Sequence, residues 1–161
     1  MTLSKGKGVR VSFFGRVDDG VLMSYYGNYG LVRIPSQVTE IGEDAFRCYG
    51  STAPFVTAVI VPDGVTRIGN DAFYGCADLQ FLYLPDSLTE IGDRAFYQCR
   101  SLKEVTIPAS VTKIGRFAFG FYKEEWEAWD VGQESEFTIL GEKGSAAECY
   151  AGEHGFSFVP V

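Results

Sequence analysis

The sequence has few of the residues that most often carry out chemistry. Its 161 residues include a single histidine, His154, whereas general acid-base catalysis at neutral pH uses imidazole most often. Asp18 and Asp19 precede a glycine, a pattern more typical of a turn than of an acid-base pair. Ser145 lies in no G-x-S-x-G or S-x-x-K motif, and we expect it to cap a short helix. With no phosphate loop or dinucleotide fingerprint either, we predict no cofactor and no enzymatic activity.

Positive charge and long apolar runs are also scarce. The net charge of -7 opposes contact with phosphate backbones and anionic lipid. No apolar run approaches the roughly 18 residues that a membrane span needs. The opening MTLSKGKGVRVSFFGRV lacks the apolar centre of a secretory signal. We therefore predict no nucleic-acid partner and no membrane insertion, and the compartment stays open.

The remaining composition, 46% hydrophobic and 22% charged, is that of an ordinary globular protein. One segment recurs four times, as IPSQVTEIGEDAF, VPDGVTRIGNDAF, LPDSLTEIGDRAF and IPASVTKIGRFAF. The Ile-Gly pairs that begin at Ile41, Ile68, Ile91 and Ile114 are spaced by 27, 23 and 23 residues. A period of about 20 to 29 residues is typical of a leucine-rich repeat solenoid.

Each repeat predicts one layer of such a solenoid. The stretches LVRI, AVIV, FLYL and EVTI alternate apolar and other residues, as half-buried strands do. Proline then ends each strand, because it has no N-H to donate, and VT-x-IG forms a second short extended piece. A single layer cannot hide its own apolar faces, so repeats must stack to build the core. The residues expected to point inward are Val32, Ile34, Val59, Val61, Leu82, Leu84, Val105 and Ile107, with Phe46, Phe73, Phe96 and Phe119 in the interior.

Stacking also predicts columns of equivalent residues. The residue before each isoleucine alternates in charge, and we expect opposite charges to pair across neighbouring layers: Glu40, Arg67, Glu90 and Lys113. The preceding column, Thr39, Thr66, Thr89 and Thr112, is either a hydroxyl ladder or a reflection of β-propensity alone.

The four cysteines, Cys48, Cys76, Cys99 and Cys149, are even in number, as in disulfide-bonded secreted proteins. Cys76 and Cys99, however, occupy the same place in successive repeats. Their Cβ atoms would lie roughly 5 Å apart on parallel vectors, which is too far for a disulfide. We therefore favour a column of buried thiols. Without a C-x-x-C pair, and with one histidine, no metal site is expected.

The repeats resemble the BspA-like branch of leucine-rich repeat proteins, whose pattern runs close to IP-x-sVt-x-IG-x-x-AF-x-x-C-x-x-L-x-x-v-x-IP. Residues 61–84 and 84–107 match it nearly position by position, including Cys76 and Leu79, then Cys99 and Leu102. DDGVLMSYYGNYGLVRIP resembles the family's opening and FTILGEKGSAAECYAGEHGFSF its closing segment. Two departures are Cys48, one place early, and Tyr122 in the last cysteine position.

The resemblance implies a β-dominated, right-handed α/β solenoid with short parallel strands, turns and short 3₁₀ or helical segments. We expect one domain over residues 1–161, with an N-terminal cap at 1–33, repeats at 34–120, and an insertion and C-terminal cap at 121–161. Trp126 and Trp129 fall in that insertion, where they either cover the last coil or contact a partner. Family members are typically bacterial or protist proteins of the cell surface with adhesive, protein-binding roles.

The outward strand positions provide the candidate site: Arg33, Ile60, Phe81, Tyr83, Glu104 and Thr106. Aromatic residues bordered by charge are typical of protein-binding surfaces. We therefore predict a protein-protein interaction module that binds a host or cell-surface protein as a monomer or weak homo-oligomer. Two alternatives are a structural spacer or self-associating module, and a carbohydrate-binding or hydrolytic accessory domain.

Overall fold

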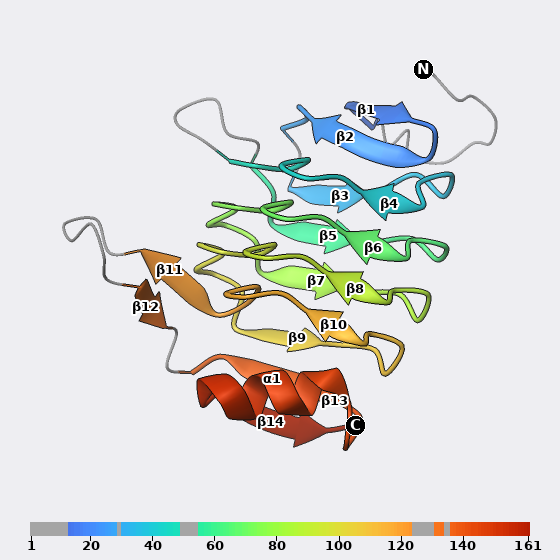
Figure 1. Ribbon diagram of the computed structural model, residues 1–161. Coiled ribbons are helices and arrows are strands. Elements are labelled where there is room, and N and C mark those ends of the chain that lie inside the picture. Colours follow the sequence, from blue (N-terminus) through green and yellow to red (C-terminus); the bar gives the residue numbers. More distant parts are fainter. Residues whose placement is uncertain (1–12, 29, 49–54, 124–130, 134–135) are drawn as a thin grey trace.

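The computed structural model describes residues 13–28, 30–48, 55–123, 131–133 and 136–161. In this part of the chain, short strands follow one another as a solenoid of about five turns (Figure 1). Four turns, which we call coils 1 to 4, each contribute a first strand and, beyond the proline turn, a second strand. The first strands are β3 (Leu31–Arg33), β5 (Ala58–Ile60), β7 (Phe81–Tyr83) and β9 (Glu104–Thr106). The second strands are β4 (Glu40–Ile41), β6 (Arg67–Ile68), β8 (Glu90–Ile91) and β10 (Lys113–Ile114).

The coils stack in register through parallel pairing of equivalent strands. Val32 of β3 pairs with Val59 of β5, and Val59 pairs with Leu82 of β7. The second strands form another sheet together with β1 (Gly15–Asp18) and β2 (Val21–Tyr25), in the order β1-β2-β4-β6-β8-β10. Residues one repeat apart in the sequence therefore lie side by side, which confirms the predicted leucine-rich repeat solenoid.

Equivalent side chains fill the interior layer by layer. The phenylalanines of the AF motif form a column in which the ring centroids of Phe46, Phe73, Phe96 and Phe119 are separated by 4.5, 4.9 and 4.7 Å, with planes 12°, 7° and 8° apart. All four rings are buried. Aromatic pairs at such separations contribute about 0.5–1.5 kcal/mol beyond the area they bury. The predicted inward strand residues are buried as well, except that Leu82 is only partly buried.

The segments between the strands are turns, and the described ranges contain no 3₁₀ helix; of the expected 3₁₀ or helical segments, the structure has one short α-helix, Ala146–His154. The residue before the alanine of each AF motif has a left-handed backbone. Its φ is 59° at Asp44, 53° at Asp71, 52° at Arg94 and 53° at Phe117. A 3₁₀ helix requires negative φ at every residue, so this position interrupts it.

The glycine of each Ile-Gly pair permits close approach of neighbouring coils. A Cβ atom on Gly69 would lie 2.7 Å from the backbone nitrogen of Glu43 and 2.8 Å from the carbonyl carbon of Gly42. A Cβ atom on Gly92 would lie 2.6 Å from the backbone nitrogen of Asn70. The obstructing atoms are backbone, so a side chain at these positions would force the coils apart.

At the N-terminal end, β1 (Gly15–Asp18) and β2 (Val21–Tyr25) form an antiparallel hairpin. Its two-residue loop is Asp19 and Gly20, with φ of 48° and 81°. Positive φ at both central residues is the mark of a type I′ turn, which matches the twist of the flanking strands. The DDG segment therefore makes a turn, as the sequence predicts.

At the C-terminal end, α1 lies across the final strands (Figure 1). The elements here are β11 (Phe121–Lys123), β12 (Val131–Gln133), β13 (Thr138–Gly141), α1 (Ala146–His154) and β14 (Ser157–Pro160). Strand β13 pairs in parallel with both β9 and β14. Trp126 and Trp129 lie outside the described residues. Within the described ranges, no helix has both the length and the apolar character needed to cross a membrane.

Ser145 occupies the N-cap position of α1, as expected, but its side chain makes no capping hydrogen bond. Instead, the carboxylate of Glu148 accepts a hydrogen bond from the backbone N-H of Gly144 at 2.6 Å. A carboxylate near the first turn is also favoured by the helix dipole. The prediction was right about the position of Ser145, but its hydroxyl makes no capping hydrogen bond.

Candidate functional site

The outward side chains of the first strands form a surface that we call the strand face. Alternation along each strand buries the middle residue and turns its neighbours outward, because successive side chains of a strand point to opposite sides. In β3, for example, Val32 is 2% exposed between two exposed residues. The strand face consists of Leu31, Arg33, Ala58, Ile60, Phe81, Tyr83, Glu104 and Thr106.

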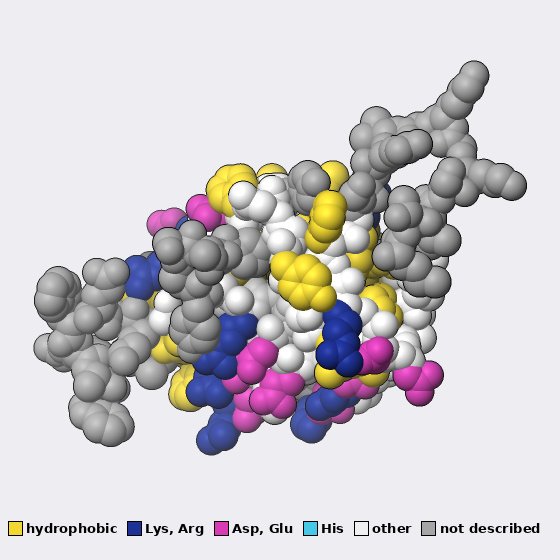
Figure 2. Space-filling model, turned by 90° about the horizontal axis from the view of Figure 1, so that it is seen from above, with side chains coloured by type: hydrophobic (Ala, Val, Ile, Leu, Met, Phe, Trp, Pro, Cys, Tyr) yellow, Lys and Arg dark blue, Asp and Glu magenta, His cyan; other side chains and the backbone are white. Residues whose placement is uncertain are grey.

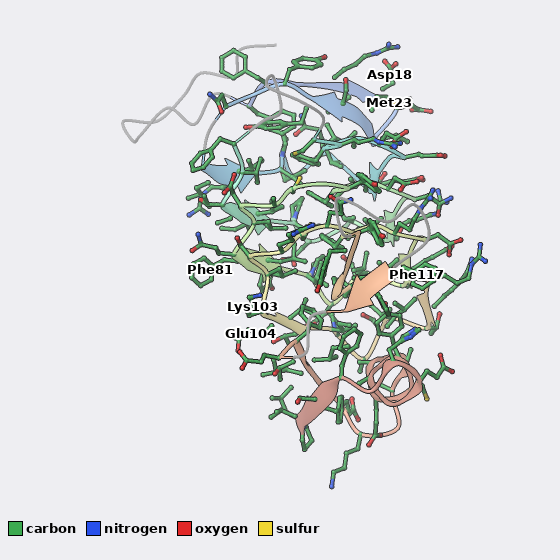
Figure 3. All side chains as sticks on the ribbon, turned by 90° about the vertical axis from the view of Figure 1, so that its left-hand side faces the viewer. Asp18, Met23, Phe81, Lys103, Glu104 and Phe117 are labelled. Carbon is green, nitrogen blue, oxygen red and sulfur yellow. The ribbon has the colours of Figure 1, made fainter. Side chains whose placement is uncertain are left out.

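The two aromatic residues of β7 are the most prominent part of this face. The side chain of Phe81 is 70% exposed and that of Tyr83 is 55% exposed. Figure 3 shows Phe81 and Glu104 projecting from the same side of the molecule, whereas Met23 and Phe117 lie toward the opposite side. Folded proteins rarely expose large apolar side chains that lie together on one surface.

Strand pairing divides the predicted site residues into two groups. Arg33, Ile60 and Tyr83 follow one another directly across the sheet β3-β5-β7, with Phe81 in the neighbouring column. Glu104 and Thr106 belong to a separate sheet, β9-β13-β14, and β9 is not hydrogen-bonded to β7. The structure thus brings four of the six residues onto one continuous sheet and places the other two on the next sheet along the stack.

The strand face extends further than the sequence analysis predicted. Thr106 pairs with Leu140 of β13, and Leu140 pairs with Val159 of β14, which is 43% exposed. The signal lay in the alternating segments FTIL and FSFV near the C-terminus. These segments lack the Ile-Gly landmark that aligns the other repeats, so their register could not be read from the repeat.

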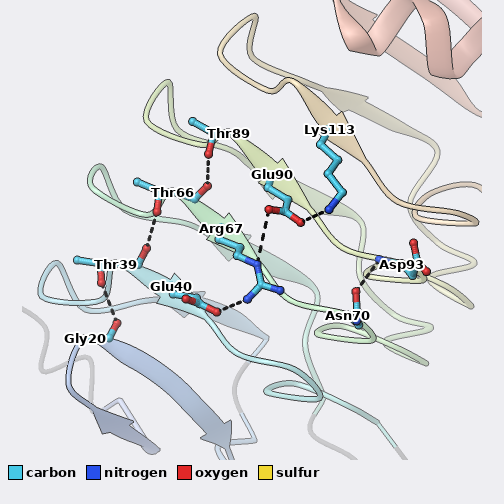
Figure 4. Close-up of polar contacts among 10 residues, drawn as sticks. All are labelled: Gly20, Thr39, Glu40, Thr66, Arg67, Asn70, Thr89, Glu90, Asp93 and Lys113. Carbon is cyan, nitrogen blue, oxygen red and sulfur yellow. Dashed lines mark hydrogen bonds and ion pairs between the residues drawn. The ribbon is translucent and has the colours of Figure 1, made fainter.

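The charges on the second strands are engaged in contacts between coils (Figure 4). Arg67 lies 2.5 Å from Glu40, and Lys113 lies 2.7 Å from Glu90, which confirms the predicted pairing across layers. The threonine column proves to be a hydroxyl-to-carbonyl ladder. In it, the hydroxyl of Thr89 donates to the carbonyl oxygen of Thr66 at 2.9 Å.

Seen from above the N-terminal coils, basic and acidic side chains lie next to each other along one flank of the molecule (Figure 2). Asp71, which the sequence analysis did not single out, is 4% exposed, and its carboxylate lies 2.8 Å from the guanidinium of Arg94 in the next coil. Ion pairs between neighbouring coils, such as that of Asp71 with Arg94, favour one register of the stack.

His154 and Asp18, which the sequence analysis weighed for catalysis, make packing and ion-pair contacts. The ring centroid of His154 lies 4.5 Å from that of Tyr150 and 5.1 Å from that of Phe121. Asp18 forms an ion pair with Arg16. Burial raises the pKa of the Tyr150 phenol, whose hydroxyl lies 3.0 Å from the backbone nitrogen of Phe119. Among the described residues, no three His, Cys, Asp or Glu side chains gather in a group suited to a metal ion.

Comparison with known proteins assigns the family. Residues 48–127 match the model of the BspA type leucine rich repeat region, in six copies. A leucine-rich repeat protein from Bacteroides capillosus is 37% identical, with a TM-score of 0.53, over 58% of this chain and 74% of that chain. The chain belongs to the BspA-type leucine-rich repeat family. A search of curated proteins finds no match.

Two further structures resemble this BspA-type chain. A leucine-rich repeat protein of T. pallidum is 26% identical with a TM-score of 0.58, over 84% of this chain and 71% of that chain. A leucine rich cell surface protein from Faecalibacterium prausnitzii is 22% identical with a TM-score of 0.54, over 88% of this chain and 46% of that chain. The second likeness is one of fold alone. Leucine-rich repeat proteins are generally not enzymes.

Proposed function

We propose that this BspA-type chain is a protein-interaction module whose strand face binds a protein partner. The observation that carries the proposal is the pair of exposed aromatic side chains on β7, Phe81 at 70% and Tyr83 at 55%. Aromatic residues dominate the binding energy of protein interfaces, because they bury a large area at a small cost in conformational entropy. A partner that covers both rings would remove them from water.

The surroundings of these rings favour a protein partner. Ile60 precedes Tyr83 in one column, and Ala58 precedes Phe81 in the other. Arg33 lies at the N-terminal side of the pair and Glu104 on β9 at the other side, and both side chains are exposed. An apolar centre with charges at its margin has the composition of a recognition surface, in which the centre supplies affinity and the margin supplies orientation. We further propose, from the family resemblance, that the partner is a cell-surface or host protein.

The solenoid supports this role by holding the strand face rigid. The middle residue of each first strand is buried or, in β7, partly buried, and each first strand pairs in parallel with at least one neighbour, so the outward side chains need little ordering when a partner binds. Preorganisation of this kind lowers the entropic cost of association.

A second candidate is self-association through the last strand. Among the described strands, β14 pairs only with β13, and Val159 and Val161 are 43% and 72% exposed. Parallel addition of another chain at this edge would resemble the stacking of one more coil. Sedimentation velocity at several concentrations tests this candidate: mass that rises with concentration supports it, and constant monomer mass contradicts it.

The strand-face proposal is tested with the double variant F81A/Y83A and a matched control, M23A/Y26A. Met23 and Tyr26 are 46% and 64% exposed, so both variants remove two exposed apolar side chains. Bound proteins are captured from extracts, identified, and titrated in purified form. We expect F81A/Y83A to raise the dissociation constant at least about 30-fold, which corresponds to a loss of about 2 kcal/mol in binding free energy.

The control variant should bind like the wild type, and circular dichroism should show both variants folded. Equal binding by F81A/Y83A and the wild type would overturn the assignment of the site. A carbohydrate captured in place of a protein would overturn the partner class.

A further inference from the structure

Two cysteines of neighbouring coils face each other in the core. The sulfur atoms of Cys48 in coil 1 and Cys76 in coil 2 lie 3.0 Å apart. Both residues are buried, at 9% and 3% exposure, and each sulfur lies 3.2 Å from the carbonyl oxygen of Phe46. Neither cysteine is in a disulfide in the structure.

The contact arises because Cys48 comes one place early in its repeat. Cys76 follows Phe73 by three residues, whereas Cys48 follows Phe46 by two, so the position equivalent to Cys48 in coil 2 is Gly75. A Cβ atom on Gly75 would lie 2.6 Å from the carbonyl oxygen of Cys48. Because Gly75 has no side chain, the backbone of Cys48 can lie close to coil 2, where the sulfur of Cys48 contacts that of Cys76.

Cys76 and Cys99 differ from this pair although they are also in adjacent coils. They occupy equivalent positions, so their side chains run parallel at roughly the strand spacing of 5 Å. The thiol of Cys99 donates instead to the carbonyl oxygen of Phe73 at 3.3 Å. Cys149, on α1, is exposed. The structure therefore favours one of the possible cysteine pairs over the others.

We propose that Cys48 and Cys76 are an oxidisable pair, which a small-molecule disulfide such as oxidised glutathione converts into a disulfide that links coil 1 to coil 2. The Cys48 thiolate attacks the oxidant, forms a mixed disulfide and releases one glutathione thiolate. Cys76 then loses its proton and attacks the Cys48 sulfur, which breaks the mixed disulfide and releases the second glutathione thiolate. Two protein thiols are oxidised and one glutathione disulfide is reduced to two thiols.

The geometry assigns the first attack to Cys48. Its thiol is the more exposed of the two, and the hydrogen bond from the Cys76 thiol lowers the pKa of Cys48. The same hydrogen bond, together with burial, raises the pKa of Cys76, so Cys76 acts second. The two sulfur atoms must approach from 3.0 Å to the disulfide bond length of about 2.05 Å.

The disulfide would add a covalent link between the stacked faces of coils 1 and 2, which otherwise touch through non-covalent contacts. Cys48 and Cys76 are 28 positions apart, and the bond closes the intervening chain into a loop. Closing such a loop restricts the unfolded chain and stabilises the fold. The oxidised protein should therefore unfold at a higher urea concentration than the reduced protein.

The test uses the full chain with Cys149→Ser, which removes the exposed thiol. The reduced, unfolded protein is refolded in glutathione buffers of increasing oxidised fraction, so that access to the buried thiols does not limit the reaction. Peptide mapping under acidic conditions then identifies the linked cysteines. We expect one cross-linked peptide, containing Cys48 and Cys76, and a shift of the urea midpoint to higher concentration.

Two further variants make the result specific. C48A should lose both the cross-linked peptide and the shift in the urea midpoint, whereas C99A should keep both. Circular dichroism of the reduced proteins checks that each variant folds. A Cys76–Cys99 cross-link, or folded protein carrying only mixed disulfides or free thiols in the most oxidising buffer, would overturn the proposal.

Discussion

The ammonium group of Lys113 in coil 4 lies 2.7 Å from a carboxylate oxygen of Glu90 in coil 3. The other carboxylate oxygen of Glu90 lies 3.8 Å from the guanidinium of Arg67 in coil 2. Acidic and basic side chains thus alternate along the stack (Figure 4). A shift of one coil by a single residue would separate these partners, so the charge column favours one register.

The pairing of Glu90 predicts a pH-dependent contribution to stability. The hydrogen bond from Lys113, and then the charges of Lys113 and Arg67, lower the pKa of the Glu90 carboxyl against the opposing effect of burial. A carboxyl whose pKa is lower in the folded state stabilises the fold above its unfolded pKa of about 4.3, and this contribution is lost as pH falls through the folded pKa. We expect E90Q to lower the free energy of unfolding by less than about 1 kcal/mol at neutral pH.

Urea unfolding at a series of pH values measures this contribution. The difference between the wild type and E90Q should shrink as the pH falls below about 4. Asp86→Asn is the matched control, since Asp86 is an exposed acidic residue of the proline turn in the same coil. If E90Q and D86N behave alike at every pH, the ion pairs of Glu90 do not stabilise the stack.

The side chain of Asn70 makes a second contact between coils, which should contribute to stability. Its amide oxygen accepts a hydrogen bond from the backbone N-H of Asp93 at 2.9 Å. We expect N70A to lower the free energy of unfolding by about 0.5–1.5 kcal/mol, because the N-H loses its protein partner. N70D keeps an acceptor oxygen and should lose less. Chemical denaturation of the three proteins checks this order, and an equal loss in N70A and N70D would contradict it.

The close approach at Gly69 predicts a strong preference for glycine. In G69A the new methyl group would meet backbone atoms of coil 1 at 2.7–2.8 Å, so coils 1 and 2 must separate locally. We expect a loss of about 1–3 kcal/mol in the free energy of unfolding. Gly152 in α1 is the control, because a Cβ atom there meets nothing within 4 Å. G152A should stabilise the protein by about 0.5–1 kcal/mol through helix propensity, and thermal unfolding compares the two. A neutral G69A would show that the coils are not in tight contact.

The repeat made the interior of this protein predictable from the sequence. Because equivalent residues lie one coil apart, the alignment of AF motifs placed Phe46, Phe73 and Phe96 in one column. The same alignment placed Glu40 beside Arg67. In a stacked solenoid, equivalent residues one repeat apart in the sequence are neighbours in space.

Features that depart from the repeat were harder to predict. The contact between Cys48 and Cys76 depends on a one-residue offset and on the missing side chain of Gly75, which a consensus alignment treats as a mismatch. Strand β9 is not hydrogen-bonded to β7, so Glu104 and Phe81 lie on different sheets although their repeats follow the same pattern. The missing cap hydrogen bond of Ser145 likewise depends on side-chain geometry, which residue type alone does not fix.

The central claim is that neighbouring coils share one continuous core, which supports the strand face. A double-mutant cycle with F73L and F96L tests it most directly, because these rings lie 4.9 Å apart. We expect a coupling free energy of about 0.5–1.5 kcal/mol for this pair. The control cycle, F46L with F119L, joins the two ends of the same column and should be additive within about 0.5 kcal/mol. If the effects of F73L and F96L on the free energy of unfolding add as fully as those of the control pair, the shared core is contradicted.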